Sequence, residues 1–182
     1  GLNMSSYSIS KSTFNSFEPR FLLAYMPHKK VSIQVGYAKM QQFVHYLSNS
    51  GAGLPSDIWV PATNDMRPEK SQQWNAGLIL PDVIKKFPLE FSLEAYYKKL
   101  SGLIDYREGA SLLSPQSLSS KVETDGKGYI YGLEFMVKRS VGKVNGWLAY
   151  TFSKNMRKFD QINNGNWYPF KFDRTHDISL VL

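Results

Sequence analysis

The sequence contains no cysteine, which excludes a disulfide framework and a thiolate metal site. No stretch reaches the roughly 18 to 20 consecutive apolar residues that a membrane helix requires. Its three histidines, His28, His45 and His176, lie far apart and lack the two-histidine helix spacing of a zinc protease. Neither a Gly-x-Ser-x-Gly nor a Walker motif occurs. These absences predict a protein that is not an enzyme, with no catalytic residue, metal site or cofactor.

One short cluster invites a different interpretation. Asp173, His176 and Asp177 lie close together in "DRTHD", a spacing that could suit a metal ion or a general base. The segment falls where a loop is expected to enter a strand, and polar residues are ordinary at such a junction. We therefore expect a structural role for these three residues.

Charge gives only a weak indication of function. The net charge is +7, from 22 basic and 15 acidic residues, and such an excess could suit nucleic acid, an anionic membrane surface or an acidic ligand. The lysines at 29, 30, 85, 86 and 143 all fall in expected turns, and no nucleic-acid recognition motif is present. A lysine-rich surface that does not bind nucleic acid is the simpler interpretation.

Residues 88–106, "PLEFSLEAYYKKLSGLIDY", show a clear strand period. Leu89, Phe91, Leu93, Ala95 and Tyr97 alternate with Glu90, Ser92, Glu94, Tyr96 and Lys98. In a soluble sandwich the apolar side would pack into a core, whereas in a membrane barrel it would face lipid and the polar side would face the lumen. This strand alone does not distinguish the two arrangements.

The same alternation predicts further strands, whose connections differ in length. Strands are expected at 18–25, 31–46, 70–80, 88–104, 129–139, 144–157 and 174–182. Short turns at 26–30, 81–87 and 141–143 alternate with long loops at 48–69, 107–127 and 160–173. Short and long connections at opposite ends of long strands are typical of an outer-membrane barrel. The sequence therefore predicts an all-β fold, an antiparallel up-and-down meander of about seven long strands that forms part of such a barrel.

This interpretation orients the strand at 88–104. Leu89, Phe91 and Leu93 are expected to face lipid, and Glu90, Glu94 and Lys98 a wet lumen, where their charges stay solvated. Aromatic residues support it, because girdle residues of barrels are apolar in body and polar at the tip. The residues of this kind are Tyr25, Tyr37, Trp74, Tyr97, Tyr131 and Tyr150. High strand propensity would explain about half of them equally well.

Six segments, in order, resemble the C-terminal half of the barrel of TonB-dependent outer-membrane receptors. They are "FEPRFLLAYMP", "MRPEKSQQWNAGL", "FSLEAYYKKLSGLIDY", "YIYGLEFMVKR", "GWLAYTFSKNMRKF" and "FDRTHDISLVL". The resemblance covers residues 17–182. It implies part of a 22-stranded barrel in the cell outer membrane of a Gram-negative bacterium, in a receptor that binds and imports a scarce nutrient such as a siderophore, a vitamin or a glycan.

The sequence also departs from the family pattern. Neither a plug domain nor a TonB-binding segment is recognisable, and the sequence stops at Leu182 without the family's closing strand and terminal aromatic residue. Residues 1–16 are expected to be an extracellular-loop remnant or a disordered start. The expected partners are outer-membrane lipid, the nutrient and a surface lipoprotein, with TonB reached only through N-terminal parts outside this sequence.

The long loops carry the best candidates for ligand contact. The candidates are Asp57, Trp59 and Asn64 in one loop and Asn163, Asn166, Trp167 and Tyr168 in another. An aromatic ring can stack on the C–H face of a sugar while amide and carboxylate groups bind its hydroxyls. These residues could equally be ordinary rim and turn residues. A soluble all-β carbohydrate-binding module is the alternative function.

Overall fold

The computed structural model describes residues 1–9, 12–47, 57–81, 88–110 and 117–182. Its strands are β1 (Leu2–Ile9), β2 (Ser12–His28), β3 (Val31–Gln42), β4 (Val44–Leu47), β5 (Ile58–Pro61), β6 (Glu69–Leu80), β7 (Leu89–Tyr106), β8 (Val122–Arg139), β9 (Gly146–Lys158), β10 (Tyr168–Pro169) and β11 (His176–Val181). A short helix, α1, spans Leu118–Lys121, and a 3-10 turn spans Asn163–Gly165. Among these residues no helix is long and apolar enough to cross a membrane.

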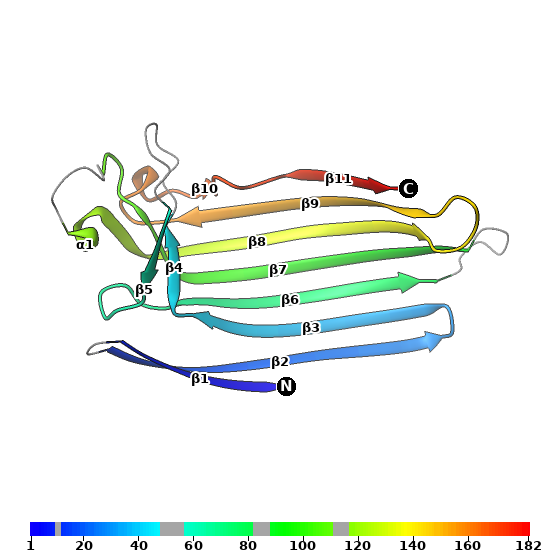
Figure 1. The fold of residues 1–182 in the computed structure, drawn as a ribbon, viewed down its shortest axis with the longest axis horizontal. Coiled ribbons are helices and arrows are strands. Elements are labelled where there is room, and N and C mark those ends of the chain that lie inside the picture. Colours follow the sequence, from blue (N-terminus) through cyan, green and yellow to red (C-terminus); the bar gives the residue numbers. More distant parts are fainter. Residues whose placement is uncertain (10–11, 48–56, 82–87, 111–116) are drawn as a thin grey trace.

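The long strands form one open antiparallel sheet (Figure 1). Its order is β1-β2-β3-β6-β7-β8-β9-β10, and β11 pairs with β9 beyond the end of β10. The sequential meander predicted for residues 70–80, 88–104, 129–139 and 144–157 is confirmed by β6 to β9. β4 and β5 form a separate two-stranded sheet.

The described connections are sorted by length between the two ends of the sheet. At one end, Lys29 and Lys30 join β2 to β3, and residues 140–145 join β8 to β9. We call this the short-turn end. The opposite end, the long-loop end, carries β4, β5, α1 and β10, as Figure 1 shows.

Two loop predictions were wrong in detail because long-range packing orders the loops. The strand expected over residues 31–46 bends at Phe43 and divides into β3 and β4, while β5 lies inside the expected loop of residues 48–69. The other loop, expected over residues 107–127, contains α1 and the start of β8.

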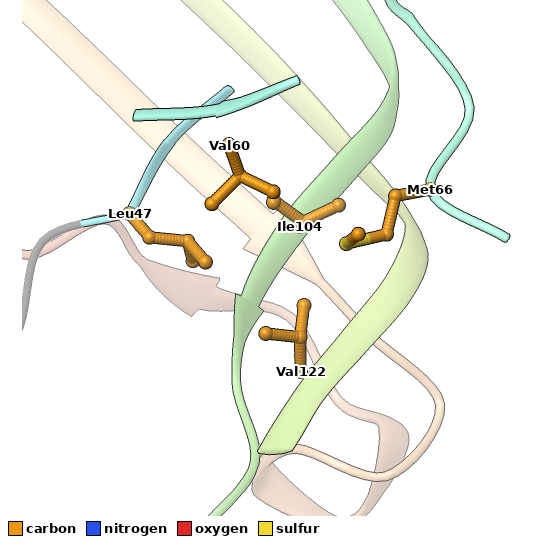
Figure 2. Close-up of a cluster of buried hydrophobic side chains, with 5 residues drawn as sticks. All are labelled: Leu47, Val60, Met66, Ile104 and Val122. Atoms are coloured by element: carbon orange, nitrogen blue, oxygen red, sulfur yellow. The ribbon is translucent and has the colours of Figure 1, made fainter. Parts of the chain in front are cut away.

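A small hydrophobic cluster explains why the long-loop end is ordered. The cluster consists of the buried side chains Leu47, Val60, Met66, Ile104 and Val122 (Figure 2). Its members come from β4, β5, the segment before β6, and the ends of β7 and β8. Their burial removes apolar surface from water and so holds the β4–β5 sheet against the ends of the long strands.

The segment expected to be an extracellular-loop remnant or a disordered start contains a paired strand. β1 pairs with the first part of β2 from Leu2 opposite Pro19 to Ile9 opposite Ser12. The amino group of Gly1 also donates a hydrogen bond of 2.6 Å to the Arg20 carbonyl. Paired backbone groups order this segment, although its sequence carries only a weak apolar alternation.

The strand register assigns side chains to two faces of the sheet. Leu93 lies opposite Phe135, which lies opposite Tyr150, and in the next row Phe91, Val137 and Leu148 are aligned in the same way. This confirms the prediction that Leu89, Phe91, Leu93, Tyr131, Leu133, Phe135, Leu148 and Tyr150 share one face, the apolar face. The opposite, polar face carries Glu90, Glu94 and Glu134.

One row of rings crosses the apolar face. Cross-strand neighbours join Phe21, Tyr37, Trp74, Tyr97 and Tyr131 on five adjacent strands. The centroid separations of the first four rings, in order, are 5.7, 5.5 and 6.0 Å. We call this set the aromatic row.

The apolar face should make the isolated chain self-associate in detergent-free buffer. Leu93 is 46% exposed and Leu133 49% exposed, and a large exposed apolar face favours association. Light scattering should show association without detergent and dispersion with it. Replacing Leu93 and Leu133 by glutamine should reduce association more than the matched changes Ser92→Gln and Thr151→Gln on the polar face. A monodisperse monomer without detergent would contradict this assignment.

Candidate functional site

A cavity of about 320 Å³ lies on the polar side of the sheet at its long-loop end. We call it the mouth cavity, and it is lined by Gln42, His45, Tyr46, Leu47, Glu69, Leu103, Ile104, Asp105, Arg157, Phe170, Lys171 and Phe172. A second hollow of about 510 Å³ shares Gln42, Glu69 and Arg157 and continues along the polar face past Lys98 and Asn155. The mouth cavity therefore opens onto the polar face.

Arg157 is the most informative residue of the mouth cavity. Strand alternation places it on the polar face of β9, with Gly128 and Tyr168 as its cross-strand neighbours. Its guanidinium carbon lies 3.4 Å from the centroid of the Phe170 ring, a cation–π arrangement that suits arginine. The backbone N–H of Phe170 donates a 2.8 Å hydrogen bond to the Asn155 carbonyl and so fixes this ring beside β9.

Two carboxylates lie near the Arg157 guanidinium without using all of its hydrogen-bond donors. Glu69 and Asp105 line the same cavity and interact electrostatically with Arg157. Among the described residues neither carboxylate forms an ion pair with the guanidinium, and the buried Nε of Arg157 makes no hydrogen bond. The charges of the mouth cavity are thus close to one another but retain capacity to bind further polar groups.

Tyr168 lies across from Arg157 and carries a second buried polar group. Its hydroxyl is buried near the Asp105 carboxylate. Burial, reinforced by the nearby Asp105 carboxylate, raises the pKa of Tyr168 to about 12. The hydroxyl therefore stays protonated near neutral pH and can donate a hydrogen bond.

His45 fixes the wall of the mouth cavity. Its side chain is almost fully buried, and its Nε2 donates a 2.9 Å hydrogen bond to the Arg67 carbonyl. Burial lowers the pKa of His45, so the ring is neutral near pH 7. The bond connects β4 to the segment that leads into β6.

The first candidate loop brings two of its three predicted residues together. The Trp59 ring lies 5.0 Å from the Tyr46 ring, centroid to centroid, and Trp59 is 67% exposed. The Tyr46 hydroxyl donates a hydrogen bond to the Asp57 carboxylate. Asn64 lies in the exposed turn between Thr63 and Met66.

The second candidate loop separates its predicted residues. The backbone N–H of Asn163 donates a 2.7 Å hydrogen bond to the Glu108 carboxylate, and Asn166 is exposed. Trp167 packs on Tyr129, with ring centroids 4.8 Å apart, on the apolar side of β8. Tyr168 lies on the polar side beside Arg157.

The seven predicted ligand residues therefore do not form one site. Asp57 and Trp59 form an outer pair, Tyr168 lies next to the mouth cavity, and Trp167 lies on the opposite side of the sheet. Their roles in binding stay predictions. Sequence reasoning missed Arg157 and Phe170, although the polar alternation of β9 already places Arg157 on the face expected to be wet.

The cluster around His176 has structural contacts. The carboxylate of Asp173 accepts a 2.7 Å hydrogen bond from the Asn155 backbone N–H. The His176 Nδ1 lies 2.8 Å from the Tyr150 hydroxyl. Within the described ranges, no three His, Cys, Asp or Glu side chains are arranged to hold a metal ion.

Comparison with known proteins gives one match. The family model described as "TonB dependent receptor-like, beta-barrel" matches residues 1–175, which include β1 to β10. No curated protein and no solved structure gives a significant match to the chain.

The titration of His45 should make the β4–β5 sheet sensitive to acid. The folded-state pKa of His45 lies below the usual value for histidine, so the unfolded segment binds more protons and stability falls as the pH drops below about 6.5. Hydrogen exchange at residues 44–47 and 58–61, corrected for intrinsic rates, should accelerate between pH 7.5 and 5. His45→Gln retains a donor for Arg67 but does not titrate. It should flatten this dependence, and an equally steep response in the variant would assign the effect to another group.

Proposed function

Because the chain belongs to the TonB-dependent receptor-like β-barrel family, we propose that it forms part of the wall and outer loops of a receptor that imports a scarce polar nutrient. The single observation that supports ligand capture most directly is the mouth cavity, with Arg157 stacked on Phe170 beneath the long loops. The nutrient would enter from the long-loop end and pass along the polar face.

The orientation of the two faces follows from the cost of placing charge in lipid. Residues 89–97 carry a continuous apolar alternation, and a tilted barrel strand needs about 9 to 11 residues to cross the bilayer. Glu94 and Glu134 lie opposite one another on the other side, where water in a lumen solvates them. We therefore place the apolar face in lipid, the short turns in the periplasm and the long loops outside the cell.

The chemistry of the mouth cavity favours a ligand rich in hydroxyl groups. Arg157 offers hydrogen-bond donors, whereas Glu69 and Asp105 offer acceptors. Tyr46 and Phe172 add ring surface beside them. A glycan fits this combination best, because rings stack on sugar C–H faces while charged groups bind hydroxyls. A siderophore or a vitamin with several polar groups is the second possibility.

The partners follow from this placement. Outer-membrane lipid would cover the apolar face, TonB would act through parts outside residues 1–182, and a surface lipoprotein could dock at the long-loop end. We propose that residues 17–182 form the partial barrel. Residues 1–16, which contain β1 and the first part of β2, would extend its wall toward the extracellular side. Family membership favours this receptor over a soluble carbohydrate-binding module.

The exposed ring pair predicts an effect of loop substitutions in the intact receptor. Trp59→Ala should weaken nutrient binding, because aromatic anchors are among the few residues that contribute about 2 kcal/mol or more at recognition surfaces. Trp167→Ala should weaken it less, because Trp167 packs on Tyr129 on the apolar side of the sheet. Lys143→Ala, in the short turn, should change affinity little; Lys85 is a second control, outside the described residues. Calorimetry with a ferric siderophore, cobalamin and an oligosaccharide gives the comparison. Equal losses at both ends would indicate general damage to the barrel.

Arg157 provides a separate test inside the mouth cavity. Arg157→Met keeps much of the side-chain volume but removes the charge and the donors, so affinity for the bound probe should fall by about tenfold or more. Arg157→Lys should restore part of it, because the charge returns without the planar fork. Intact folding is checked by the gel mobility of unheated and heated receptor. Unchanged affinity in a folded Arg157→Met receptor would remove the mouth cavity from the binding model.

A further inference from the structure

Five lysines form a strip across the sheet, immediately beyond the aromatic row on the side of the long loops. The strip consists of Lys39 on β3, Lys70 on β6, Lys99 on β7, Lys127 on β8 and Lys158 on β9. These residues have the same strand parity as the aromatic row, so they belong to the outward, apolar face of the sheet. None of them belongs to the mouth cavity.

The register places these lysines in two adjacent rows. In the first row Lys39, Gln72, Lys99, Tyr129 and Met156 are cross-strand neighbours. The second row contains Gln41, Lys70, Ser101, Lys127 and Lys158. Lys99 is therefore diagonal to both Lys70 and Lys127, a separation of about 7 to 8 Å.

The two rows contain no carboxylate. Along the strands, Glu69 adjoins Lys70 but has the opposite parity and lines the hollow on the polar face with Glu18. Asp125 lies two residues from Lys127 on β8. Within the described residues no ion pair involves any of the five lysines. Lys127 lies directly opposite Lys158, and like charges in this position destabilise a sheet. An anion between the two rows would remove that repulsion.

The position of the strip relative to the lipid indicates the source of the anion. Rings of the aromatic row mark the boundary between hydrocarbon and headgroups. The first lysine row lies two residues farther along the strands, about 7 Å, and flexible lysine stems can bring ammonium groups to the level of the headgroups. Apolar residues continue on the other side of the aromatic row toward the short turns.

We propose that the lysine strip binds the phosphate groups of anionic lipids in the outer leaflet of the outer membrane. The strip spans five adjacent strands, a width of about 19 Å at the usual strand spacing, which accommodates a headgroup with more than one phosphate. The proposal rests on the membrane orientation given above but not on nutrient binding. It assigns these residues a role in holding the lipid shell around the receptor.

The test uses the intact receptor and a lipid of defined phosphate content. The variant Lys99→Gln/Lys127→Gln removes two charges from the centre of the strip. The control Lys29→Gln/Lys143→Gln removes two charges from the short-turn end. Native mass spectrometry in mild detergent measures binding of diphosphorylated lipid A, of the same lipid without its phosphates, and of diphosphorylated lipid A in the presence of inorganic phosphate.

We expect the wild type and the control to bind diphosphorylated lipid A alike. The strip variant should bind it about tenfold or more weakly, since each basic residue near an anionic surface contributes about 1 kcal/mol. Removing the phosphates from the lipid should produce a similar loss in the wild type. Millimolar inorganic phosphate should compete poorly, because it lacks acyl chains that anchor it in the detergent shell.

Three outcomes would overturn the proposal. They are equal binding by the two double variants, equal binding of the lipid with and without phosphates, and complete displacement by inorganic phosphate, which would instead indicate a site for a soluble anion. Nutrient affinity of the strip variant should stay at the wild-type value. A receptor that binds lipid A through the strip but no nutrient would refute only the proposed function.

Discussion

The ladder of backbone hydrogen bonds between β2 and β9 is the constraint on which the rest of the structure depends. Hydrocarbon offers no partner for a peptide N–H or C=O group, so a membrane-crossing strand must pair along its whole length with both neighbours. The pairing is continuous across β7 and β8 from Leu89 opposite Arg139 to Ser101 opposite Lys127. Because the ladder fixes the register, it also fixes which side chains share a row and a face.

Because side chains alternate along each strand, the apolar face and the polar face of the sheet carry different residues. On the apolar face, aliphatic and aromatic side chains fill the band between the short turns and the aromatic row. On the polar side, glycine makes room for a neighbouring side chain: a Cβ on Gly132 would lie 2.6 Å from the Tyr96 hydroxyl oxygen. Glycine at this position lets the Tyr96 ring lie over β8. Charges such as Arg157 then gather where the polar face meets the loops.

The long strands were predictable because their signal is local. An alternation with a period of two residues identifies β6, β7 and β9, and short polar turns locate one end of the sheet. β1 was missed because "LNMSSYSI" alternates too weakly to distinguish its faces, and only pairing with β2 orders it. β4 and β5 depend on burying Leu47 and Val60 against distant strand ends, which no local pattern reveals.

The candidate site was less predictable than the sheet for the same reason. Sequence reasoning favoured exposed aromatic and amide residues in the loops, and it grouped Trp167 with Tyr168. Adjacent residues in extended backbone point to opposite sides, so Trp167 meets Tyr129 while Tyr168 meets the Arg157 side. The stacking of Arg157 on Phe170 needs the loop after β9 to fold back on that strand.

The central claim is that the apolar face lies in lipid and the polar face in a wet lumen. The chain has no cysteine of its own, so single cysteines can be introduced at Leu93, Leu133, Glu94 and Glu134 in the intact receptor and spin-labelled in bilayers. Labels at 93 and 133 should be relaxed more by oxygen than by a water-soluble nickel complex, and labels at 94 and 134 should show the reverse. The opposite pattern, or equal access of the nickel complex to all four positions, would contradict this account.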